Sequence, residues 1–372
     1  MSRFFDLVSR AARDLRPAAV RDPAPSQAGG GPQLIKLDSN ENPFGPSPHA
    51  IDAMQKMLAG TASYPDDDCA LLRHKLAEHH GVQPEQVLVT AGSTGILGLL
   101  CQTLLGPGLN AVTSQRSFVV YAMVVQAAGA SLVEAPMRDD RFDLEKIFAT
   151  IDSNTRIVFL ANPNNPTGTM LEAPMVERFL KRLPSHVVAV LDEAYYEFAM
   201  HFAALRRVVY SKSLDYVRRN ASVVVLRTFS KTHGLAGLRI GYGLGPAELL
   251  DYCARLRNTY SVSSVAQAAA VAALDDRLHI QRVVENNAIE SRDLTAGLLA
   301  LGYRVAPTAA NFVYCDLGKN AGDFADRLQQ EGIAVRPLES WGAPHAIRVT
   351  IGRPEQNRAF LDAAQRLSLK LV

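Results

Sequence analysis

Residues 186–198 read HVVAVLDEAYYEF, a Val-rich apolar run that stops at two carboxylates and two tyrosines. A short apolar run with polar boundaries is typical of a strand covered on both faces, as in a parallel sheet. Six similar runs lie before and after it, separated by stretches with helical patterning. The seven runs are QVLVT (86–90), NAVTS (110–114), ASLVEA (130–135), RIVFLA (156–161), HVVAVL (186–191), SVVVLR (222–227) and RIGYGL (239–244). Strands alternating with helices predict an α/β fold whose large domain holds a mainly parallel, seven-stranded sheet.

The pattern changes near residue 262. An Ala-rich helical region comes first, and four further apolar runs follow: YRVAP (303–307), ANFVYCD (310–316), GIAVRPL (332–338) and AIRVTIG (346–352). This part predicts a smaller α+β domain. Because 372 residues exceed one typical domain, we expect three parts. They are an N-terminal helix and arm (1–50), a large domain (51–262) and a small C-terminal domain (263–372).

Near the N-terminus, apolar residues recur at helical spacing at Phe4, Val8, Ala11 and Leu15. The stripe lacks the unbroken apolar core of a signal peptide. We expect an amphipathic helix that packs on the body of the protein or on a partner subunit. The stretch 17–32, rich in Pro, Gly and Ala, is typical of an extended arm.

The composition argues against several classes of protein. The net charge of +2 offers no basic footprint for nucleic acid, and no run is long and apolar enough to span a membrane. The four cysteines have no CxxC spacing, which favours free thiols in a reducing compartment. We predict a cytoplasmic protein with no metal site, no nucleic-acid partner and no membrane association. The cysteines are Cys69, Cys101, Cys253 and Cys315.

Polar residues follow four of the predicted strands. In an open α/β sheet, ligands bind outside the carboxyl ends of the strands. The stretch AGSTG (91–95) opens a helix, so its backbone N–H groups and hydroxyls form a ready anion site. NPNNPTG (162–168), DEAYYEF (192–198) and TFSKT (228–232) supply amides, a carboxylate with a phenol, and a lysine. Each alone could be a turn, a helix cap or a solvated lysine, but together they occupy one edge of the sheet.

This combination of groups suits pyridoxal phosphate. That cofactor needs a lysine for its Schiff base, a carboxylate for its pyridine nitrogen, donors for its ring oxygen and an anion site for its phosphate. In TFSKTHGLAGLRIGY (228–242), an amine and a guanidinium lie eight residues apart, which fits the aldehyde and the phosphate. The matching residues are Lys231 for the aldehyde, Asp192 for the nitrogen, Tyr195 and Asn165 for the ring oxygen, and Gly92, Ser93, Thr94, Ser230 and Arg239 for the phosphate.

The chain resembles the fold-type-I pyridoxal-phosphate aminotransferases, and most closely the histidinol-phosphate aminotransferase family. The resemblance covers about residues 34–365. It rests on LDSNENPFGPSP, SYPD, NPNNPTG, DEAYYEF, SKTHGLAGLRIGY, ANFVY, GIAVRPL and IRVTIG, which occur in this order. It implies the type I transferase fold, an aminotransferase of amino-acid biosynthesis that uses an amino donor and a 2-oxo acid acceptor, and a homodimer with shared active sites.

The resemblance also implies roles for single residues. Lys231, Asp192 and Tyr195 would be catalytic, with Lys231 holding the cofactor and moving a proton at the substrate Cα. Tyr64 would reach the cofactor phosphate of the neighbouring subunit, and Phe118 would stack on the cofactor ring. The implied substrate-binding residues are Arg348, Arg336, Asn311 and Asn42.

There is a physical reason for a substrate site to contain two arginines, because a guanidinium binds a carboxylate or phosphate through two hydrogen bonds. A substrate that is anionic at both ends would use Arg348 at one end and Arg336 at the other. The alternative is that Arg336 pairs with a neighbouring carboxylate of the protein and does not contact substrate.

The chain departs from the family pattern at two places. Thr94 and Gly95 stand where the family usually has an acidic pair, and the arm lacks the tyrosine that helps to hold the substrate phosphate. Arg21 is the candidate substitute in the arm. These departures affect the prediction of the substrate more than the prediction of the cofactor. An alternative is therefore a paralogue that acts on aromatic or specialised amino acids.

Three other functions fit parts of the sequence. A decarboxylase similar to threonine-phosphate decarboxylases would use the same cofactor residues. A nicotinamide-dependent dehydrogenase would need GxGxxG spacing, which AGSTGILG (91–98) does not have, and an acidic residue near 112–118, which is missing. A non-catalytic regulatory module would be expected to have lost Lys231 or Asp192, and both are present.

Overall fold

The computed structural model describes residues 7–15 and 34–369. Its larger sheet has seven strands in the order β2-β10-β9-β8-β7-β3-β4. Neighbouring strands are parallel except at β10, which is antiparallel to both β2 and β9. The strands are β2 (Val87–Thr90), β3 (Asn110–Ser114), β4 (Ser131–Ala135), β7 (Thr155–Ala161), β8 (Val188–Asp192), β9 (Val223–Thr228) and β10 (Gly241–Leu244). All seven predicted runs form strands, and the mainly parallel α/β fold is confirmed.

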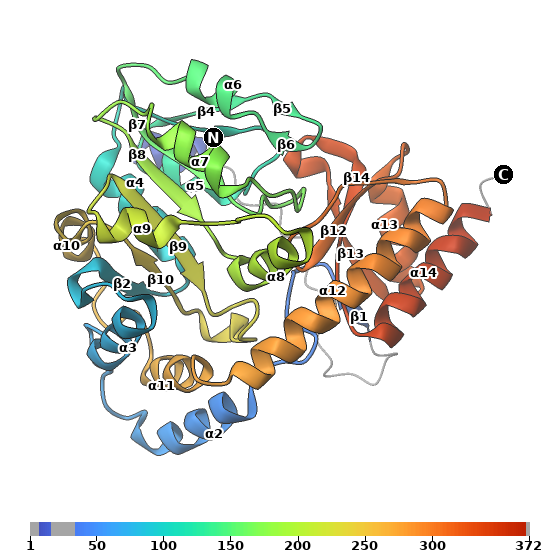
Figure 1. Ribbon diagram of the computed structural model, residues 1–372, viewed down its shortest axis with the longest axis horizontal. Helices are drawn as coiled ribbons and strands as arrows, with labels where there is room; N and C mark the ends of the chain where they lie inside the picture. The colour runs from blue at the N-terminus through green and yellow to red at the C-terminus, as the bar shows by residue number, and fades with distance from the viewer. Residues whose placement is uncertain (1–6, 16–33, 370–372) are drawn as a thin grey trace.

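Helices surround this sheet (Figure 1). All residues of β3 and of β9 are buried, as expected for strands covered on both faces. The helices of this part are α2 (Pro48–Met57), α3 (Ala70–His80), α4 (Ser93–Leu104), α5 (Val120–Ala127), α6 (Leu144–Ala149), α7 (Ala173–Leu180), α8 (Tyr196–Arg206), α9 (Ser213–Arg218), α10 (Ala247–Arg255) and α11 (Ser264–Ala273). Short 3-10 turns lie at η1 (Leu58–Gly60), η2 (Pro84–Gln86) and η3 (Ala236–Leu238).

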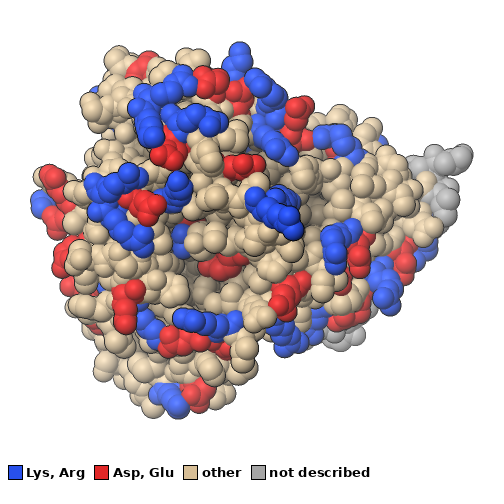
Figure 2. Space-filling view, in the orientation of Figure 1, with Lys and Arg blue, Asp and Glu red and all other residues tan. Residues whose placement is uncertain are grey.

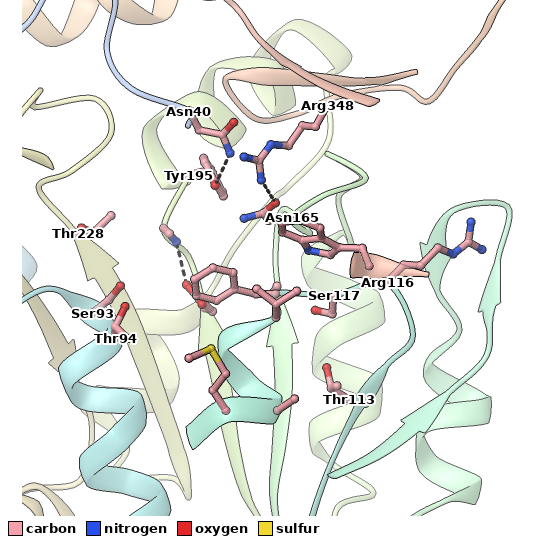
Figure 3. A pocket seen from close by; sticks show the side chains of 18 of the residues that line it. Asn40, Ser93, Thr94, Thr113, Arg116, Ser117, Asn165, Tyr195, Thr228 and Arg348 are labelled. Carbon is pink, nitrogen blue, oxygen red and sulfur yellow. Dashed lines mark hydrogen bonds between the residues drawn. The ribbon is translucent and has the colours of Figure 1, made fainter. Parts of the chain in front are cut away.

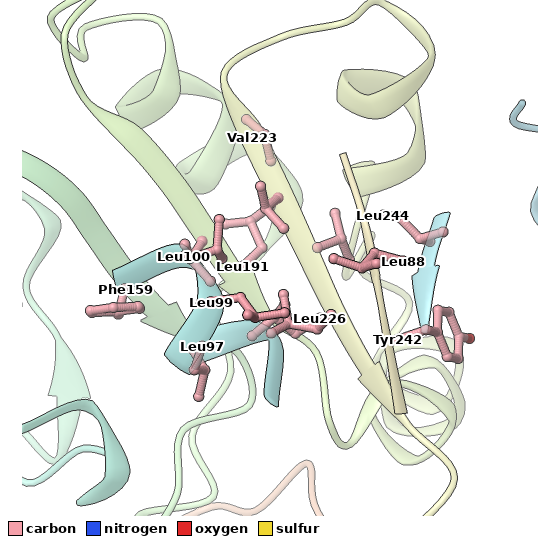
Figure 4. Close-up of a cluster of buried hydrophobic side chains, with 14 of the residues drawn as sticks. Leu88, Leu97, Leu99, Leu100, Phe159, Leu191, Val223, Leu226, Tyr242 and Leu244 are labelled. Atoms are coloured by element: carbon pink, nitrogen blue, oxygen red, sulfur yellow. The ribbon is translucent and has the colours of Figure 1, made fainter. Parts of the chain in front are cut away.

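The main hydrophobic core lies between α4 and the sheet (Figure 4). Leu97 and Leu100 of α4 are fully buried, as are Phe159 of β7 and Leu226 of β9. Burying a side chain of this size contributes roughly 1.5–3 kcal/mol to stability. The packing fixes α4 against the sheet, and so fixes the position of its N-terminus.

A second sheet of five strands has the order β1-β13-β14-β12-β11. Helices α12 (Arg277–Ala300), α13 (Ala321–Gln330) and α14 (Pro354–Leu369) pack with it around a separate apolar core, and α12 runs from the large part to the small part (Figure 1). The strands are β1 (Ile35–Leu37), β11 (Arg304–Val305), β12 (Phe312–Asp316), β13 (Ile333–Leu338) and β14 (Ala343–Thr350), with the turn η4 (Glu339–Trp341) between the last two. The smaller α+β part is therefore present as expected.

Strand β1 joins the N-terminal segment to the small part, where it pairs in parallel with β13 and so extends the small sheet. The sequence predicted neither this pairing nor one small hairpin. Strands β5 (Met137–Arg138) and β6 (Arg141–Phe142) form a small hairpin. The division of the chain at residues 50 and 262 stays a prediction.

Near the N-terminus, the described part of the predicted helix is α1 (Arg10–Asp14), which contacts α5. Phe4, the arm at 17–32 and Arg21 lie outside the described residues. Over residues 7–15 and 34–369, no helix is both long and apolar enough to cross a membrane. Cys69, Cys101, Cys253 and Cys315 are buried free thiols.

Candidate active site

A cavity of about 1280 Å³ lies between the carboxyl ends of the large sheet and the β13–β14 region of the small sheet (Figure 3). Both sheets contribute to its lining, because β8 and β9 end at it on one side and β13 and β14 border it on the other. The predicted site residues that line it are Gly92, Ser93, Thr94, Phe118, Asn165, Asp192, Tyr195, Ser230, Lys231, Arg239, Arg336 and Arg348.

Lys231 follows the end of β9 by three residues and projects its amine toward the N-terminal segment of the chain. The Nζ atom donates to the backbone oxygens of Asn40 at 3.1 Å and Ser39 at 3.4 Å. Burial lowers the pKa of Lys231 to about 7, and the charges of Arg348 and Arg239 act in the same direction. A lysine in this state has a large neutral fraction near neutral pH, so it can act as a nucleophile or a base.

Asp192 is the last residue of β8, and its side chain is buried. The hydroxyl of Tyr121 donates to its Oδ2 at 2.9 Å, and the backbone N–H of Ala194 donates to its Oδ1 at 3.3 Å. Burial raises the pKa of Asp192 to about 6, against the effect of these two hydrogen bonds. A buried carboxylate with no cation bonded to it is suited to receive a positively charged N–H donor.

Tyr195 and Asn40 both line the cavity and form a hydrogen-bonded pair. Asn40 Nδ2 donates to the Tyr195 hydroxyl at 2.9 Å, a contact visible in Figure 3. Burial raises the pKa of Tyr195. Asn40 adopts a left-handed backbone conformation, and its N–H donates to Thr350 Oγ1 at 2.9 Å. The pair therefore links the N-terminal segment to both sheets.

The N-terminus of α4 forms an anion cradle. Gly92 caps the helix at a φ of 81°, and Ser93 and Thr94 lie at its first turn (Figure 3). A Cβ atom at Gly92 would lie 2.8 Å from Arg239 Nη2, so the guanidinium sits directly against the glycine. Backbone N–H groups, hydroxyls and a guanidinium thus converge where the helix dipole also favours negative charge.

Two arginines border the cavity from the small sheet, at facing positions of β13 and β14. Arg348 is buried, donates from Nη1 to Asn165 Oδ1 at 2.6 Å, and donates from Nη2 to the Asp38 backbone oxygen at 2.8 Å. Burial lowers the pKa of Arg348 to about 10. Arg336 lies 3.5 Å from the Asp38 carboxylate, so it has the protein partner that was considered as the alternative to a substrate.

Three predicted residues do not line the cavity. Asn311 donates from Nδ2 to the Asn40 backbone oxygen at 3.0 Å, so it helps to hold Asn40 in place at the cavity. Asn42 donates to the Thr232 backbone oxygen at 2.8 Å and accepts from the Phe44 N–H at 2.9 Å, so it braces the segment around Lys231. Tyr64 is 82% exposed and stacks on Tyr260 with ring centroids 4.6 Å apart.

Sequence reasoning missed three residues of this site: Asn40, Tyr121 and Trp341. Asn40 stands in the motif LDSNENPFGPSP, where Asn42 was chosen in its place. Tyr121 comes three residues after Phe118 and packs edge-on against its ring, but no motif marked it. Trp341 lies in a turn, and no motif marked it.

Comparisons with known protein families and with similar proteins point to the same kind of active site. Residues 32–363 match the family model for aminotransferase class I and II. The chain is 42% identical over 334 residues to histidinol-phosphate aminotransferase 2 of Pseudomonas fluorescens, covering 90% of this chain and 89% of that protein. It is 43% identical over 330 residues to histidinol-phosphate aminotransferase 2 of Pseudomonas aeruginosa, covering 89% and 88%.

Solved structures show the same similarity. The histidinol-phosphate aminotransferase of Sinorhizobium meliloti, in complex with pyridoxal-5'-phosphate, superposes with a TM-score of 0.89 over 99% of both chains at 29% identity. The L-threonine-O-3-phosphate decarboxylase of Porphyromonas gingivalis shares the fold, with a TM-score of 0.79 over 90% of this chain and 99% of that chain, at 23% identity. The chain described here belongs to the class I and II aminotransferase family.

Proposed function

We propose that this aminotransferase uses pyridoxal 5'-phosphate to move an amino group between histidinol phosphate and a 2-oxo acid, with glutamate as the other amino compound. One observation carries the proposal: the Lys231 amine, the Asp192 carboxylate and the α4 cradle line one cavity, and Arg348 faces them. The names of the similar proteins support histidinol phosphate as the donor. Cytoplasmic location is part of the same proposal.

The residues present fit pyridoxal phosphate. Position 92 favours glycine, since its φ of 81° would strain any other residue and a Cβ there would displace Arg239 Nη2, which would lie 2.8 Å away. This leaves the helix N-terminus and the guanidinium open to a phosphate. Asp192 would accept the N–H of a pyridinium ring, Tyr195 and Asn165 would bond the ring oxygen, and Phe118 would cover one ring face. Thr94 and Gly95, which replace the family's acidic pair, leave this cradle intact.

When bound, pyridoxal phosphate supplies an aldehyde that takes up the amino group and a ring that accepts electrons from the substrate Cα. The protein contributes proton transfer and electrostatics. Lys231 would accept the proton from the substrate Cα as a general base and return it, as a general acid, to the cofactor carbon that had carried the aldehyde. Asp192 would stabilise the positive charge at the ring nitrogen, and this partner would lower the pKa of Asp192 from its raised value.

Arg348 is the proposed site of the substrate anion. In histidinol phosphate and in glutamate, the anionic group lies near the carbon that bears nitrogen, so one guanidinium can orient both. Arg348 is already held by Asn165 and by the Asp38 backbone, so little ordering remains to be done on binding. Arg336 would act on the distal part of the substrate or keep Asp38 in place.

We further propose that the active unit is a homodimer. Large apolar side chains are exposed on η1, on α3, in the loops that precede α3 and α11, and at the start of α12, and α2 and α3 both contact α11. Such patches mark protein–protein contacts. Tyr64 lies on this surface, where a second copy would bring it to the neighbouring cofactor phosphate. The exposed residues are Leu58, Tyr64, Leu71, Tyr260 and Leu278.

The test is an assay of single amino compounds with 2-oxoglutarate, in which glutamate formation and carbon dioxide release are both measured. We expect glutamate from histidinol phosphate at a kcat/KM at least tenfold above that for phenylalanine or histidine, and no carbon dioxide. Carbon dioxide from threonine phosphate without glutamate would assign a decarboxylase in place of an aminotransferase. Faster turnover of phenylalanine would make the chain an aromatic aminotransferase.

The matched variant for the substrate site is Arg348→Lys. It keeps one positive charge but loses the paired donors of the guanidinium, so KM should rise for both histidinol phosphate and glutamate. Arg255→Lys, on the exposed face of α10, is the control and should leave both KM values unchanged.

A further inference from the structure

Trp341 is the single tryptophan of the chain, and it lines the cavity from the turn η4. The turn joins β13, which carries Arg336, to β14, which carries Arg348. Gly342 follows at a φ of 70°, which lets the chain reverse directly after the indole. The tryptophan thus lies at the small-sheet side of the cavity, beside Arg348.

Two donors on this side of the cavity have no acceptor among residues 7–15 and 34–369. They are the indole Nε1 of Trp341 and the Nε of Arg348, and both atoms are buried. A buried donor without a partner is costly, and native proteins pair the great majority of such groups. The Arg348 Cζ atom lies 5.8 Å from the centroid of the Trp341 ring, so the two residues are neighbours in the wall of the cavity.

The charges near these two donors indicate which chemical group would bind to them. Arg348 bonds only neutral oxygens, those of Asn165 and of the Asp38 backbone, while the Asp38 carboxylate lies beside Arg336. Both unpaired atoms are donors, so they require a group that only accepts. An anion with several oxygens, next to a buried guanidinium without a carboxylate partner, meets both needs.

We propose that Trp341 is a substrate-binding residue whose indole N–H donates to the phosphate of the amino donor, beside Arg348. The inference rests on the proposed function, in which the substrate anion lies at Arg348. A carboxylate has two oxygens, and a bidentate guanidinium occupies both. A phosphate ester has three terminal oxygens, which leaves one for the indole. Trp341 therefore favours a phosphorylated donor over an amino acid.

The first test compares wild type with Trp341→Phe, which keeps an aromatic ring but removes the N–H. We expect the KM for histidinol phosphate to rise about tenfold or more, as for a hydrogen bond to a charged group, with kcat changed less. The KM for glutamate should change less than twofold. Equal KM changes for the two substrates, or no change in either, would overturn the role of Trp341 while leaving the aminotransferase function in place.

The second test uses the fluorescence of Trp341, which is free of background from any other tryptophan. Inorganic phosphate, added to the cofactor-loaded enzyme, should change this fluorescence saturably, and the change should be lost in Arg348→Lys. Tyr252→Phe, an exposed site on α10, is the matched control and should behave as wild type. If phosphate competes with substrate in the assay but leaves the fluorescence unchanged, the contact with Trp341 is wrong. If the enzyme turns over none of the amino compounds, the proposed function is wrong. A saturable change in fluorescence would even then support a contact between phosphate and Trp341.

Discussion

The surroundings of Lys231 determine the pKa of its amine. Within the part of the chain that the structure describes, the amine donates to backbone carbonyl oxygens and bonds no carboxylate. Burial is the main cause of its lowered pKa, and the two arginines on opposite sides of the cavity add to the effect. The residue is therefore kept reactive near neutral pH by burial, with a smaller contribution from the two cations that would hold the two anions.

This state predicts a pH dependence of cofactor attachment. With a pKa of about 7, Lys231 is mostly protonated at pH 6 and mostly neutral at pH 8. Only the neutral amine attacks an aldehyde, so the rate of attachment to cofactor-free protein should rise about tenfold between these pH values. The measurement is the growth of visible absorbance after mixing. A rate that keeps rising about tenfold per pH unit through pH 9 would show an ordinary lysine.

At the residue scale, the sequence predicted those side chains that directly follow a strand. Lys231, Asp192 and Asn165 could be found because the carboxyl ends of parallel strands share one edge. Asn40 and Trp341 could not, since they reach the cavity from β1 and η4, whose positions depend on the small sheet. Asn42 was preferred to Asn40 because a motif does not reveal which of its amides faces inward.

At the scale of elements, the N-terminus of α4 depends on Gly92. A side chain there would meet Arg239 and would also be strained at a φ of 81°. Gly92→Ala should therefore raise the dissociation constant for pyridoxal phosphate by about tenfold or more. The measurement is equilibrium titration followed by absorbance.

Gly98 provides the control within the same helix. A Cβ atom at this position would meet nothing within 4 Å. Gly98→Ala should leave cofactor affinity unchanged and stabilise the helix by up to about 1 kcal/mol. Equal affinity in the two variants would contradict the role given to the cradle.

Strands β8 and β9 are joined behind the site by a buried ion pair. Arg227 donates to Glu193 Oε2 from Nη2 at 2.8 Å and from Nε at 3.2 Å, and Ser213 donates to the same oxygen at 3.0 Å. Only 4% and 2% of the two side chains are exposed. Since Glu193 follows Asp192 directly, the pair fixes the backbone that carries the carboxylate of the site.

Removing the cation alone should be costly. Arg227→Met leaves the Glu193 carboxylate buried without its cation, which should lower the free energy of unfolding by about 3–5 kcal/mol in urea denaturation. Arg255→Met breaks an exposed pair with Asp251 and should cost less than about 1 kcal/mol. A loss of similar size in both variants would contradict the structural role of the buried pair.

Most elements could be predicted because their apolar periods are strong. The seven strands of the large sheet and the four later runs of the small sheet appear where the sequence indicated. The antiparallel direction of β10 and the pairing of β1 with β13 could not be predicted, because strand direction and long-range pairing leave no local pattern. The β5–β6 hairpin has two residues in each strand and is too short to give a period.

At the scale of the whole molecule, the face shown in Figure 2 carries cations and anions interspersed, without a large patch of one sign. The cavity contrasts with this surface, because Arg239, Arg336, Arg348 and Lys231 all line it. Such a concentration of positive charge attracts anionic substrates. The apolar residues exposed around Tyr64 lie elsewhere, on the surface proposed for the second subunit.

Shared active sites predict that two inactive variants can restore each other. Lys231→Ala and Tyr64→Ala each damage a different half of a shared site. In a mixed dimer, one site carries both changes and the other carries neither. Random exchange of subunits should therefore restore about one quarter of wild-type activity. The measurement is activity after the two variants are unfolded and refolded together, with separately refolded variants as the control. Activity no higher than in the separate variants would contradict a site completed by Tyr64.

The most direct test of the central claim is to find where pyridoxal phosphate is attached. The enzyme is loaded with the cofactor, treated with borohydride to make the lysine linkage permanent, digested and analysed by mass spectrometry. The account predicts that the label lies on Lys231 alone, and that Lys231→Ala carries no label and shows no visible absorbance band. A label on another lysine, or none on the wild type, would contradict the account.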